Sequence, residues 1–225
     1  MTGQYDANYA NFRTELYEEI RREALGEDIG QNSWLTADEQ DRFLNWLGLG
    51  AGNGLLDVAC GAGGPALRMA VVTHCTVTGV DVHEQAIATA RSLATQRSVE
   101  SRADFRVVDA DKQLPFADAS FEAVTCIDAI NHLPERLRVL TDWARLLKPG
   151  GRLLFTDPTV VTGPLTNAEV AVRSSSGFYL FVPRAYDERM IAQCDLQVVV
   201  CEDRTRNMAE IAERRAKARD SRSAA

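Results

Sequence analysis

The chain has 225 residues, 45% of them hydrophobic and 25% charged, with seven prolines and a formal net charge of −7. A chain of this length is expected to fold as one domain whose core needs no disulfide or metal crosslink. The composition excludes a collagen, a disordered protein and a disulfide-rich scaffold. No apolar run reaches the roughly 18 residues of a membrane helix, and residues 1–19 lack the pattern of a signal peptide. We therefore expect a soluble, cytoplasmic protein with no membrane partner.

Cysteines and charges narrow the class of partners. Five cysteines stand singly in apolar surroundings, without a C-x-x-C pair or a histidine at ligand spacing. Such a set is typical of reduced thiols and predicts no metal site. The negative net charge argues against a nucleic-acid partner, although residues 206–225 hold six basic residues against three acids. Residues 204–225 are expected to form a solvated basic helix or tail, with phosphate binding as the alternative.

From residue 54 onward, short β-branched runs alternate with stretches of helical period, the pattern of βα units around a parallel sheet. The predicted strands are Gly54–Ala59, Cys75–Asp81, Ala103–Asp109, Phe121–Asp128, Arg152–Asp157 and Leu196–Glu202. The predicted helices of this part are Gly64–Val72, Glu84–Gln96, Pro134–Leu147 and Tyr186–Cys194. Four of the first five strands end on an aspartate. Because ligands of open α/β sheets bind beyond the carboxyl ends of the strands, these acids lie at the expected site.

The remaining segments give the expected domain organisation. Residues 1–50 are predicted to form a helical cap with helices at Tyr9–Leu25 and Thr36–Leu47, the second begun by a Thr36-x-x-Glu39 capping box. Residues 51–203 form the predicted core. Within it, the apolar 158–185 insertion is too long for a simple connection and is predicted to be a lid or pocket wall. No seventh strand follows the sixth.

A glycine-rich turn follows the first strand, in the stretch Asp57-Val-Ala-Cys-Gly61-Ala-Gly63-Gly64-Pro65. Glycines let the backbone approach a ligand closely, and a helix N-terminus offers unpaired N–H groups to a phosphate or carboxylate. Asp81 ends the second strand, twenty residues after Gly61, where an acid can accept both hydroxyls of a ribose. A helix N-cap is the alternative role of Asp81. The turn also satisfies the dinucleotide fingerprint, so an NAD-dependent oxidoreductase is an alternative function at this point.

Three further stretches follow in order: Asp109-Ala-Asp111, then LPFADASF at residues 114–121, then LLKPGGRLLFTD at residues 146–157. With LDVACGAGG at residues 56–64, they resemble the small-molecule group of class I S-adenosylmethionine-dependent methyltransferases. The resemblance implies a Rossmann-like, doubly wound and mostly parallel sheet, S-adenosylmethionine as methyl donor with S-adenosylhomocysteine as product, and a small-molecule acceptor. Ala59 stands where most members have a glycine. The family's last, antiparallel strand is missing, so either the chain is truncated or another chain, as in a homodimer, completes the sheet.

The resemblance also implies contacts with the cofactor. Asp57 would brace the glycine turn, Asp81 would accept the ribose hydroxyls and Asp109 would bind the adenine amino group. The stretch Gln31–Trp34 would fold over the cofactor or close the acceptor pocket, with core packing as the alternative for Trp34. The implied cofactor-binding residues are Asp57, Ala59, Gly61, Gly63, Asp81, Val82, Asp109, Ala110, Ile127, Gln31, Ser33 and Trp34.

Catalysis would need little acid–base chemistry, because a sulfonium leaving group needs no proton and orientation and desolvation supply most of the acceleration. His132 is the predicted general base for the acceptor's proton, since imidazole titrates near neutral pH; a helix cap is its alternative role. Asp157 is predicted to orient His132 or to bind an amine acceptor, and its alternative is a turn before Pro158. The apolar 178–181 stretch predicts a partly apolar acceptor. A protein that binds the cofactor without turnover, or depends on a partner subunit, is the alternative function.

Overall fold

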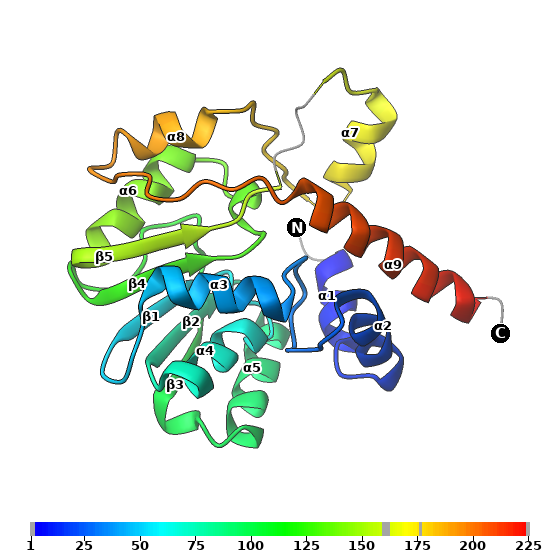
Figure 1. The fold of residues 1–225 in the computed structure, drawn as a ribbon, viewed down its shortest axis with the longest axis horizontal. Helices are drawn as coiled ribbons and strands as arrows, with labels where there is room; N and C mark the ends of the chain where they lie inside the picture. The colour runs from blue at the N-terminus through cyan, green and yellow to red at the C-terminus, as the bar shows by residue number, and fades with distance from the viewer. Residues whose placement is uncertain (1–2, 159–162, 176, 224–225) are drawn as a thin grey trace.

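A computed structural model describes residues 3–158, 163–175 and 177–223. Five parallel strands form one sheet in the order β3-β2-β1-β4-β5 (Figure 1). The strands are β1 Gly54–Val58, β2 Thr76–Asp81, β3 Ala103–Val107, β4 Phe121–Cys126 and β5 Leu147–Phe155. The helices are α1 Gly3–Asn11, α2 Glu15–Leu25, α3 Ala37–Leu47, α4 Gly64–Thr73, α5 Glu84–Gln96, α6 Arg136–Leu146, α7 Asn167–Ser174, α8 Tyr186–Ile191 and α9 Thr205–Ser223, with 3-10 turns η1 Glu100–Arg102 and η2 Ile130–His132.

Helices cover both faces of the sheet, because the apolar side chains of parallel strands need burial on both sides. On one face, α4 and α5 pack against Leu55 of β1 and Phe105 of β3. On the other face, Leu56 of β1 packs with α6, whose Trp143 has no exposed surface. The predicted Rossmann-like α/β fold is confirmed, and β1 to β4 lie within two residues of their predicted bounds.

The N-terminal helices differ from the prediction. The predicted single helix Tyr9–Leu25 is wrong, because α1 ends at Asn11 and α2 begins at Glu15. Thr14 has the extended backbone of a helix N-cap, and its hydroxyl donates to the carbonyl oxygen of Asn11 at 2.8 Å. The turn between the helices buries Phe12. A complete capping box begins α3, as predicted.

The far edge of the sheet also differs from the prediction. β5 begins at Leu147 and not at Arg152, because the KPGG stretch joins the strand through an irregular register against β4. The predicted strand Leu196–Glu202 is wrong: these residues have no strand partner, and Val199 is 87% exposed. A strand forms only where a neighbour supplies backbone hydrogen bonds, and no described strand lies beyond β5.

The 158–185 insertion holds a helix that was not predicted. A capping box between Thr166 and Glu169 begins α7. Residues 159–162 and 176 of the predicted lid lie outside the described residues. After the insertion, α8 ends at Ile191, three residues before the predicted end.

The C-terminal helix α9 is not simply solvated, because one side of it packs along α2 (Figure 1). Ile211 of α9 has no exposed surface and contacts Ala24 and Leu25 of α2. Arg222 forms ion pairs with Glu19 and Glu23. Within the part of the chain that the structure describes, no helix is both long and apolar enough to span a bilayer.

Candidate active site at the carboxyl ends of the strands

The strand order reverses between β1 and β4, which places a crevice at their carboxyl ends. Asp57 of β1 lies buried there, and its Oδ1 accepts a hydrogen bond from the Thr125 hydroxyl of β4 at 2.7 Å. Burial, together with the nearby charge of Asp81, raises the pKa of Asp57 to about 7. The Asp57–Thr125 contact therefore joins the two strands that flank the crevice.

The glycine turn bends sharply over this crevice. Gly61 has φ of +55° and Gly63 has φ of +76° at the start of α4. Ala59, which replaces the usual glycine, also lies in the left-handed region, with φ of +55°. This conformation costs roughly 1 kcal/mol in an L-residue with a side chain. The turn therefore keeps the conformation of a glycine-rich loop although one glycine is absent.

Asp81 connects this turn to the end of β2. Its Oδ2 accepts from the backbone N–H of Gly61 at 2.8 Å, and its Oδ1 accepts from the N–H of His83 at 2.9 Å. Burial raises the pKa of Asp81, and the two N–H donors oppose that effect. A carboxylate offers about four acceptor positions, so both oxygens keep capacity for ribose hydroxyls. The neighbouring Val82 is 57% exposed, an apolar surface against which an aromatic base can pack.

The predicted adenine contacts lie at the end of β3. The Asp109 side chain is 42% exposed, and its Oδ1 accepts from the backbone N–H of Asp111 at 3.0 Å. Its other oxygen pairs with Lys112 at 3.3 Å. Ala110 is partly buried against the cluster beneath α6. Asp109 is therefore accessible from solvent, in contrast to the buried Asp57 and Asp81.

Two tyrosines of α1, which the sequence reasoning missed, close the crevice from above. Tyr9 is 6% exposed, and a methyl group at Gly61 would lie 2.8 Å from its hydroxyl oxygen. Burial and the charge of Asp81 raise the pKa of Tyr9 well above its ordinary value. The rings of Tyr5 and Tyr9 both pack against His83, at centroid distances of 5.7 and 5.6 Å. Residues four apart lie on one face of a helix, so the spacing of Tyr5 and Tyr9 was the sequence feature that could have shown that they act together.

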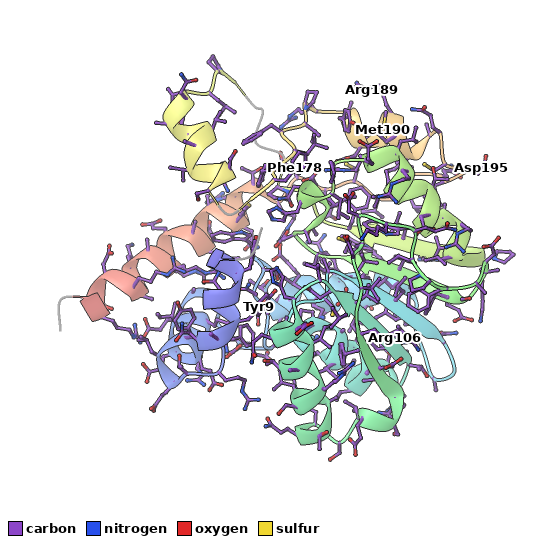
Figure 2. All side chains as sticks on the ribbon, turned by 180° about the vertical axis from the view of Figure 1, so that it is seen from behind. Tyr9, Arg106, Phe178, Arg189, Met190 and Asp195 are labelled. Carbon is purple, nitrogen blue, oxygen red and sulfur yellow. The ribbon has the colours of Figure 1, made fainter. Side chains whose placement is uncertain are left out.

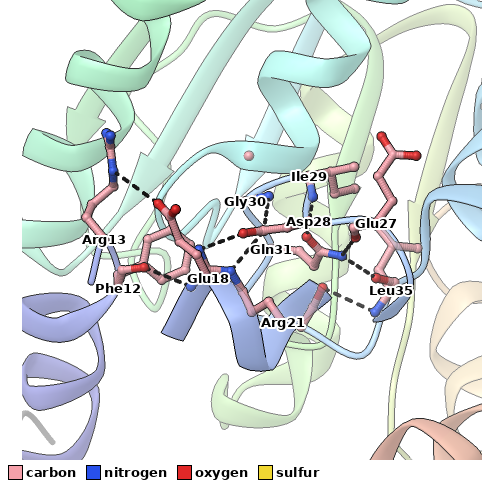
Figure 3. Close-up of polar contacts among 12 residues, drawn as sticks. Phe12, Arg13, Glu18, Arg21, Glu27, Asp28, Ile29, Gly30, Gln31 and Leu35 are labelled. Atoms are coloured by element: carbon pink, nitrogen blue, oxygen red, sulfur yellow. Dashed lines mark hydrogen bonds and ion pairs between the residues drawn. The ribbon is translucent and has the colours of Figure 1, made fainter. Parts of the chain in front are cut away.

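Gln31 shapes the loop between α2 and α3 (Figure 3). It is completely buried; its Oε1 accepts from the N–H of Ile29 at 2.9 Å. Its Nε2 donates to the carbonyl oxygens of Glu27 and Leu35 at 3.2 and 3.1 Å. All three partners belong to the same loop. The structure therefore places the Gln31 side chain inside the loop, where its amide bonds to the loop backbone and not to residues of the crevice.

Trp34 attaches this loop to the ends of β4 and β5, and Ser33 attaches it to α9. The N–H of Trp34 donates to Oδ2 of Asp128 at 2.8 Å, and the hydroxyl of Thr156 donates to Oδ1 of the same carboxylate. Burial raises the pKa of Asp128. The guanidinium of Arg215 lies 4.4 Å above the Trp34 ring and donates to the carbonyl oxygen of Ser33 at 3.0 Å. Asp128, one of the strand-ending aspartates that the sequence places at this edge, thus holds the cap against the sheet.

Ile127, beside Asp128, packs with the apolar side chains of this cap. Its neighbours are Ile29, Leu35 and Phe43. The Ile127 side chain therefore joins the end of β4 to the loop and α3.

His132 lies between α1 and the 158–185 segment, with a partner on each ring nitrogen. Its Nδ1 is 2.7 Å from the carbonyl oxygen of Phe178, and its Nε2 is 3.0 Å from the Tyr5 hydroxyl. A carbonyl oxygen can only accept, so Nδ1 carries the hydrogen and Nε2 is the acceptor, with Tyr5 as donor. Tyr9 marks α1 and Phe178 marks the 158–185 segment in Figure 2, and both of these elements approach the carboxyl ends of the strands. His132 thus has the tautomer that a general base acting through Nε2 requires.

Asp157 does not contact His132, because its carboxylate belongs to a different cluster. Its Oδ2 accepts from Nη1 of Arg136 at 2.8 Å, and the same nitrogen pairs with Asp187 of α8. The Arg136 side chain is completely buried and that of Asp157 is 4% exposed. Burial raises the pKa of Asp187 to about 6. Arg136 was not predicted as a site residue, since an arginine at the start of a helix carries no distinguishing signal.

A cavity of about 2060 Å³ opens beside the carboxyl end of β5. Trp34, Asp128, Thr156, Asp157, Phe181 and Asp187 line its part at the carboxyl end of β5. From there the cavity runs along the unpaired edge of β5 to residues 196–204. Among the described residues, no group of His, Cys, Asp and Glu side chains has a metal-binding arrangement.

Comparisons with known proteins identify this arrangement. Residues 56–155 match a family model described as a methyltransferase domain. The 27-O-demethylrifamycin SV methyltransferase of Amycolatopsis mediterranei (strain S699) is 35% identical over 159 residues, which cover 67% of this chain and 58% of that protein. The chain thus spans less than two thirds of this relative's length.

Two solved structures share the fold. One is phosphoethanolamine N-methyltransferase 2 of Haemonchus contortus in complex with S-adenosyl-L-methionine, with a TM-score of 0.81 and 23% identity over 99% of this chain and 51% of that chain. The other is the [4+2]-cyclase SpnF, with a TM-score of 0.70 and 26% identity over 96% of this chain and 83% of that chain. The matching domain, the sheet order and the glycine turn together show that the chain belongs to the methyltransferase domain family, with the class I fold of S-adenosylmethionine-dependent methyltransferases.

Proposed function

We propose that the protein transfers a methyl group from S-adenosylmethionine to a hydroxyl group of a small, partly apolar acceptor. The observation that carries this proposal is the position of His132 shortly after β4, where its Nε2 already accepts from a hydroxyl group, that of Tyr5. Family membership supplies the class of reaction. The hydroxyl acceptor is supported by the name of the Amycolatopsis relative, 27-O-demethylrifamycin SV methyltransferase.

The residues of the crevice fit an adenosyl amino acid. The left-handed turn at Gly61 and Gly63 presents no side chain of its own to the crevice, and the Tyr9 hydroxyl lies close to Gly61. Asp81 has acceptor positions for a ribose, and Val82 offers an exposed apolar surface for adenine. When bound, S-adenosylmethionine supplies a methyl group on a sulfonium, an electrophile whose leaving group needs no proton. We propose that Asp57, Ala59, Asp109, Ala110 and Ile127 complete this site.

His132 would hold the acceptor's proton at Nε2. The Phe178 carbonyl keeps the hydrogen on Nδ1, so the basic nitrogen points toward the Tyr5 hydroxyl. An acceptor hydroxyl would replace that hydroxyl as the donor to Nε2. Tyr5 would then act as a positioning residue that holds the imidazole until the acceptor arrives. Asp157 would not orient His132, because Arg136 occupies its Oδ2.

The acceptor would occupy the cavity beside β5, which Trp34 and Phe181 line. The ring of Tyr179 packs against both Phe181 and His132, at centroid distances of 4.8 and 5.8 Å. We propose that residues 1–50 act as a cap and residues 158–185 as a lid over this cavity. Water would thereby be kept from the reacting groups. Gln31 and Ser33 would contribute indirectly, by holding the loop that carries Trp34.

The experiment incubates the protein with S-adenosylmethionine and a panel of hydroxylated natural products, beginning with 27-O-demethylrifamycin SV, and detects the mass gain of one methyl group. His132→Asn is expected to lower kcat at least a hundredfold, the usual contribution of general base catalysis. The matched control is His74→Asn, at the exposed C-cap of α4, where asparagine tolerates the left-handed backbone. Turnover of His132→Asn within a few-fold of the original protein would remove the base assignment.

A second candidate function is cofactor binding without methyl transfer. It is favoured by the 26% identical neighbour that is named a cyclase, since one fold can carry different chemistries. The same experiment separates the two functions. Binding of S-adenosylmethionine with no methylated product from any hydroxylated, amine or carbon acceptor would favour the second.

A further inference from the structure

One side chain of the 158–185 segment, that of Tyr179, contacts the proposed base directly. Its ring lies edge-on to the His132 imidazole, with the two ring planes at 85°. The same ring packs against Phe181, a residue that lines the acceptor cavity. The Tyr179 hydroxyl donates to the carbonyl oxygen of Pro158 at 2.8 Å, just after β5. Tyr179 therefore joins the imidazole both to the wall of the cavity and to the end of the sheet.

The backbone on both sides of Tyr179 is attached to η2. The carbonyl oxygen of Phe178 accepts from Nδ1 of His132 at 2.7 Å. The N–H of Leu180 donates to the carbonyl oxygen of Asn131, also at 2.7 Å. Burial raises the pKa of Tyr179 to about 12, so its hydroxyl keeps its proton near neutral pH and remains a donor. The backbone and the ring of Tyr179 thus hold this stretch of chain at the same place on η2.

The Phe178 carbonyl decides which nitrogen of His132 is basic. In the part of the chain that the structure describes, it is the only hydrogen-bond partner of Nδ1. A hydroxyl group can donate or accept, so the Tyr5 hydroxyl at Nε2 is compatible with either tautomer. If residue 178 moved away from the ring, the position of the hydrogen would no longer be specified. Nε2 therefore stays a proton acceptor only while this carbonyl stays at Nδ1.

We infer that Tyr179 is a positioning residue whose ring holds the Phe178 carbonyl on His132 and so keeps Nε2 basic. The inference rests on the proposed function for the role of His132 as the base. Because the same ring packs against Phe181, the base and the wall of the acceptor cavity share one support.

The first test records nitrogen-15 NMR spectra of the histidine side chains at pH 9, where a neutral imidazole carries its hydrogen on one nitrogen. The chain has three histidines, and His132→Asn identifies the signals of His132. The original protein is expected to show the Nδ1–H tautomer. Tyr179→Leu is expected to replace it with a mixture of tautomers, whereas Tyr179→Phe keeps both ring contacts and should retain it. The matched control is Tyr17→Leu on α2, whose ring contacts no histidine among the described residues, and it should retain the tautomer as well.

The second test asks whether Tyr179 acts through His132, and it uses the acceptor that the panel identifies. Tyr179→Leu is expected to lower kcat at least about fivefold with KM for S-adenosylmethionine within twofold, because a misplaced base loses part of its contribution. In a His132→Asn background the same substitution should change kcat less than twofold, because the group that Tyr179 positions is absent.

Several results would overturn the inference. They are the Nε2–H tautomer in the original protein, an unchanged tautomer in Tyr179→Leu, and loss of the tautomer in Tyr179→Phe. An equal loss of kcat with and without His132 would overturn it too, since Tyr179 would then not act through the base. The original protein and Tyr179→Phe can overturn it even where Tyr179→Leu does not fold. Absence of methyl transfer from every acceptor would refute the proposed function alone, because the NMR comparison requires no turnover.

Discussion

Replacing Asp57 with asparagine should change how stability depends on pH. The carboxyl group has a pKa of about 7 in the folded protein against an ordinary value of 3.8, chiefly because it is buried. A raised folded pKa means that Asp57 stabilises the fold while it is protonated. This contribution to the free energy of unfolding is fully present below pH 4 and is lost as the pH rises through about 7. Between these two limits the free energy of unfolding falls by about 4 kcal/mol.

The assay is urea unfolding of the original protein and of Asp57→Asn at pH 5 and pH 8. Asparagine cannot ionise, so the variant does not lose this stability as the pH rises. Its free energy of unfolding relative to that of the original protein should therefore increase by about 3 kcal/mol from pH 5 to pH 8. Asp104→Asn removes an exposed carboxylate from β3 and is the control, expected to leave the pH profile parallel to that of the original protein. Parallel profiles for Asp57→Asn would refute the reasoning, because they would mean that Asp57 titrates alike in both states.

Three further predictions concern packing and exposure. Gly64→Ala would place a methyl group 2.1 Å from the carbonyl oxygen of Gly30, so a loss of about 1–3 kcal/mol in urea unfolding is expected. Gly50→Ala, whose methyl group would lie at an ordinary contact distance of 3.9 Å from Oδ1 of Asn53, should change little. A midpoint for Gly64→Ala equal to that of the control would contradict this close packing. Ile211→Ala should cost about 2–5 kcal/mol if α9 is docked on α2, and an unchanged midpoint would mean that it is not. Of the five cysteines, Cys201 is exposed and the others are buried, so a thiol reagent should modify one thiol rapidly in the folded protein; two rapid modifications would contradict this burial.

The central strands could be predicted closely because they are buried on both faces. Gly54–Val58 and Phe121–Cys126 are short, mostly apolar runs, and their length and the turn residues that bound them distinguish them from helices. Leu196–Glu202 has the same composition, yet it is not a strand. Its pairing depends on a neighbour beyond β5, and local composition contains no information about that neighbour.

The candidate site could be predicted only where a motif marks it. The glycine turn, Asp81 and His132 follow strands directly, so their positions at one edge of the sheet follow from the topology. Tyr5, Asp128 and Arg136 enter the site through contacts between distant segments, such as the 3.0 Å contact from Tyr5 to His132. Gln31 shows the opposite case, in which a residue of a promising stretch has its polar atoms engaged within its own loop.

The central claim, that the crevice between β1 and β4 binds an adenosyl amino acid, is tested most directly by calorimetric titration. S-adenosylmethionine, S-adenosylhomocysteine and NAD are titrated in parallel into the purified protein. The account predicts that the two adenosyl amino acids bind with one site each and that NAD produces no heat of binding. Binding of NAD alone, or of none of the three, would contradict it.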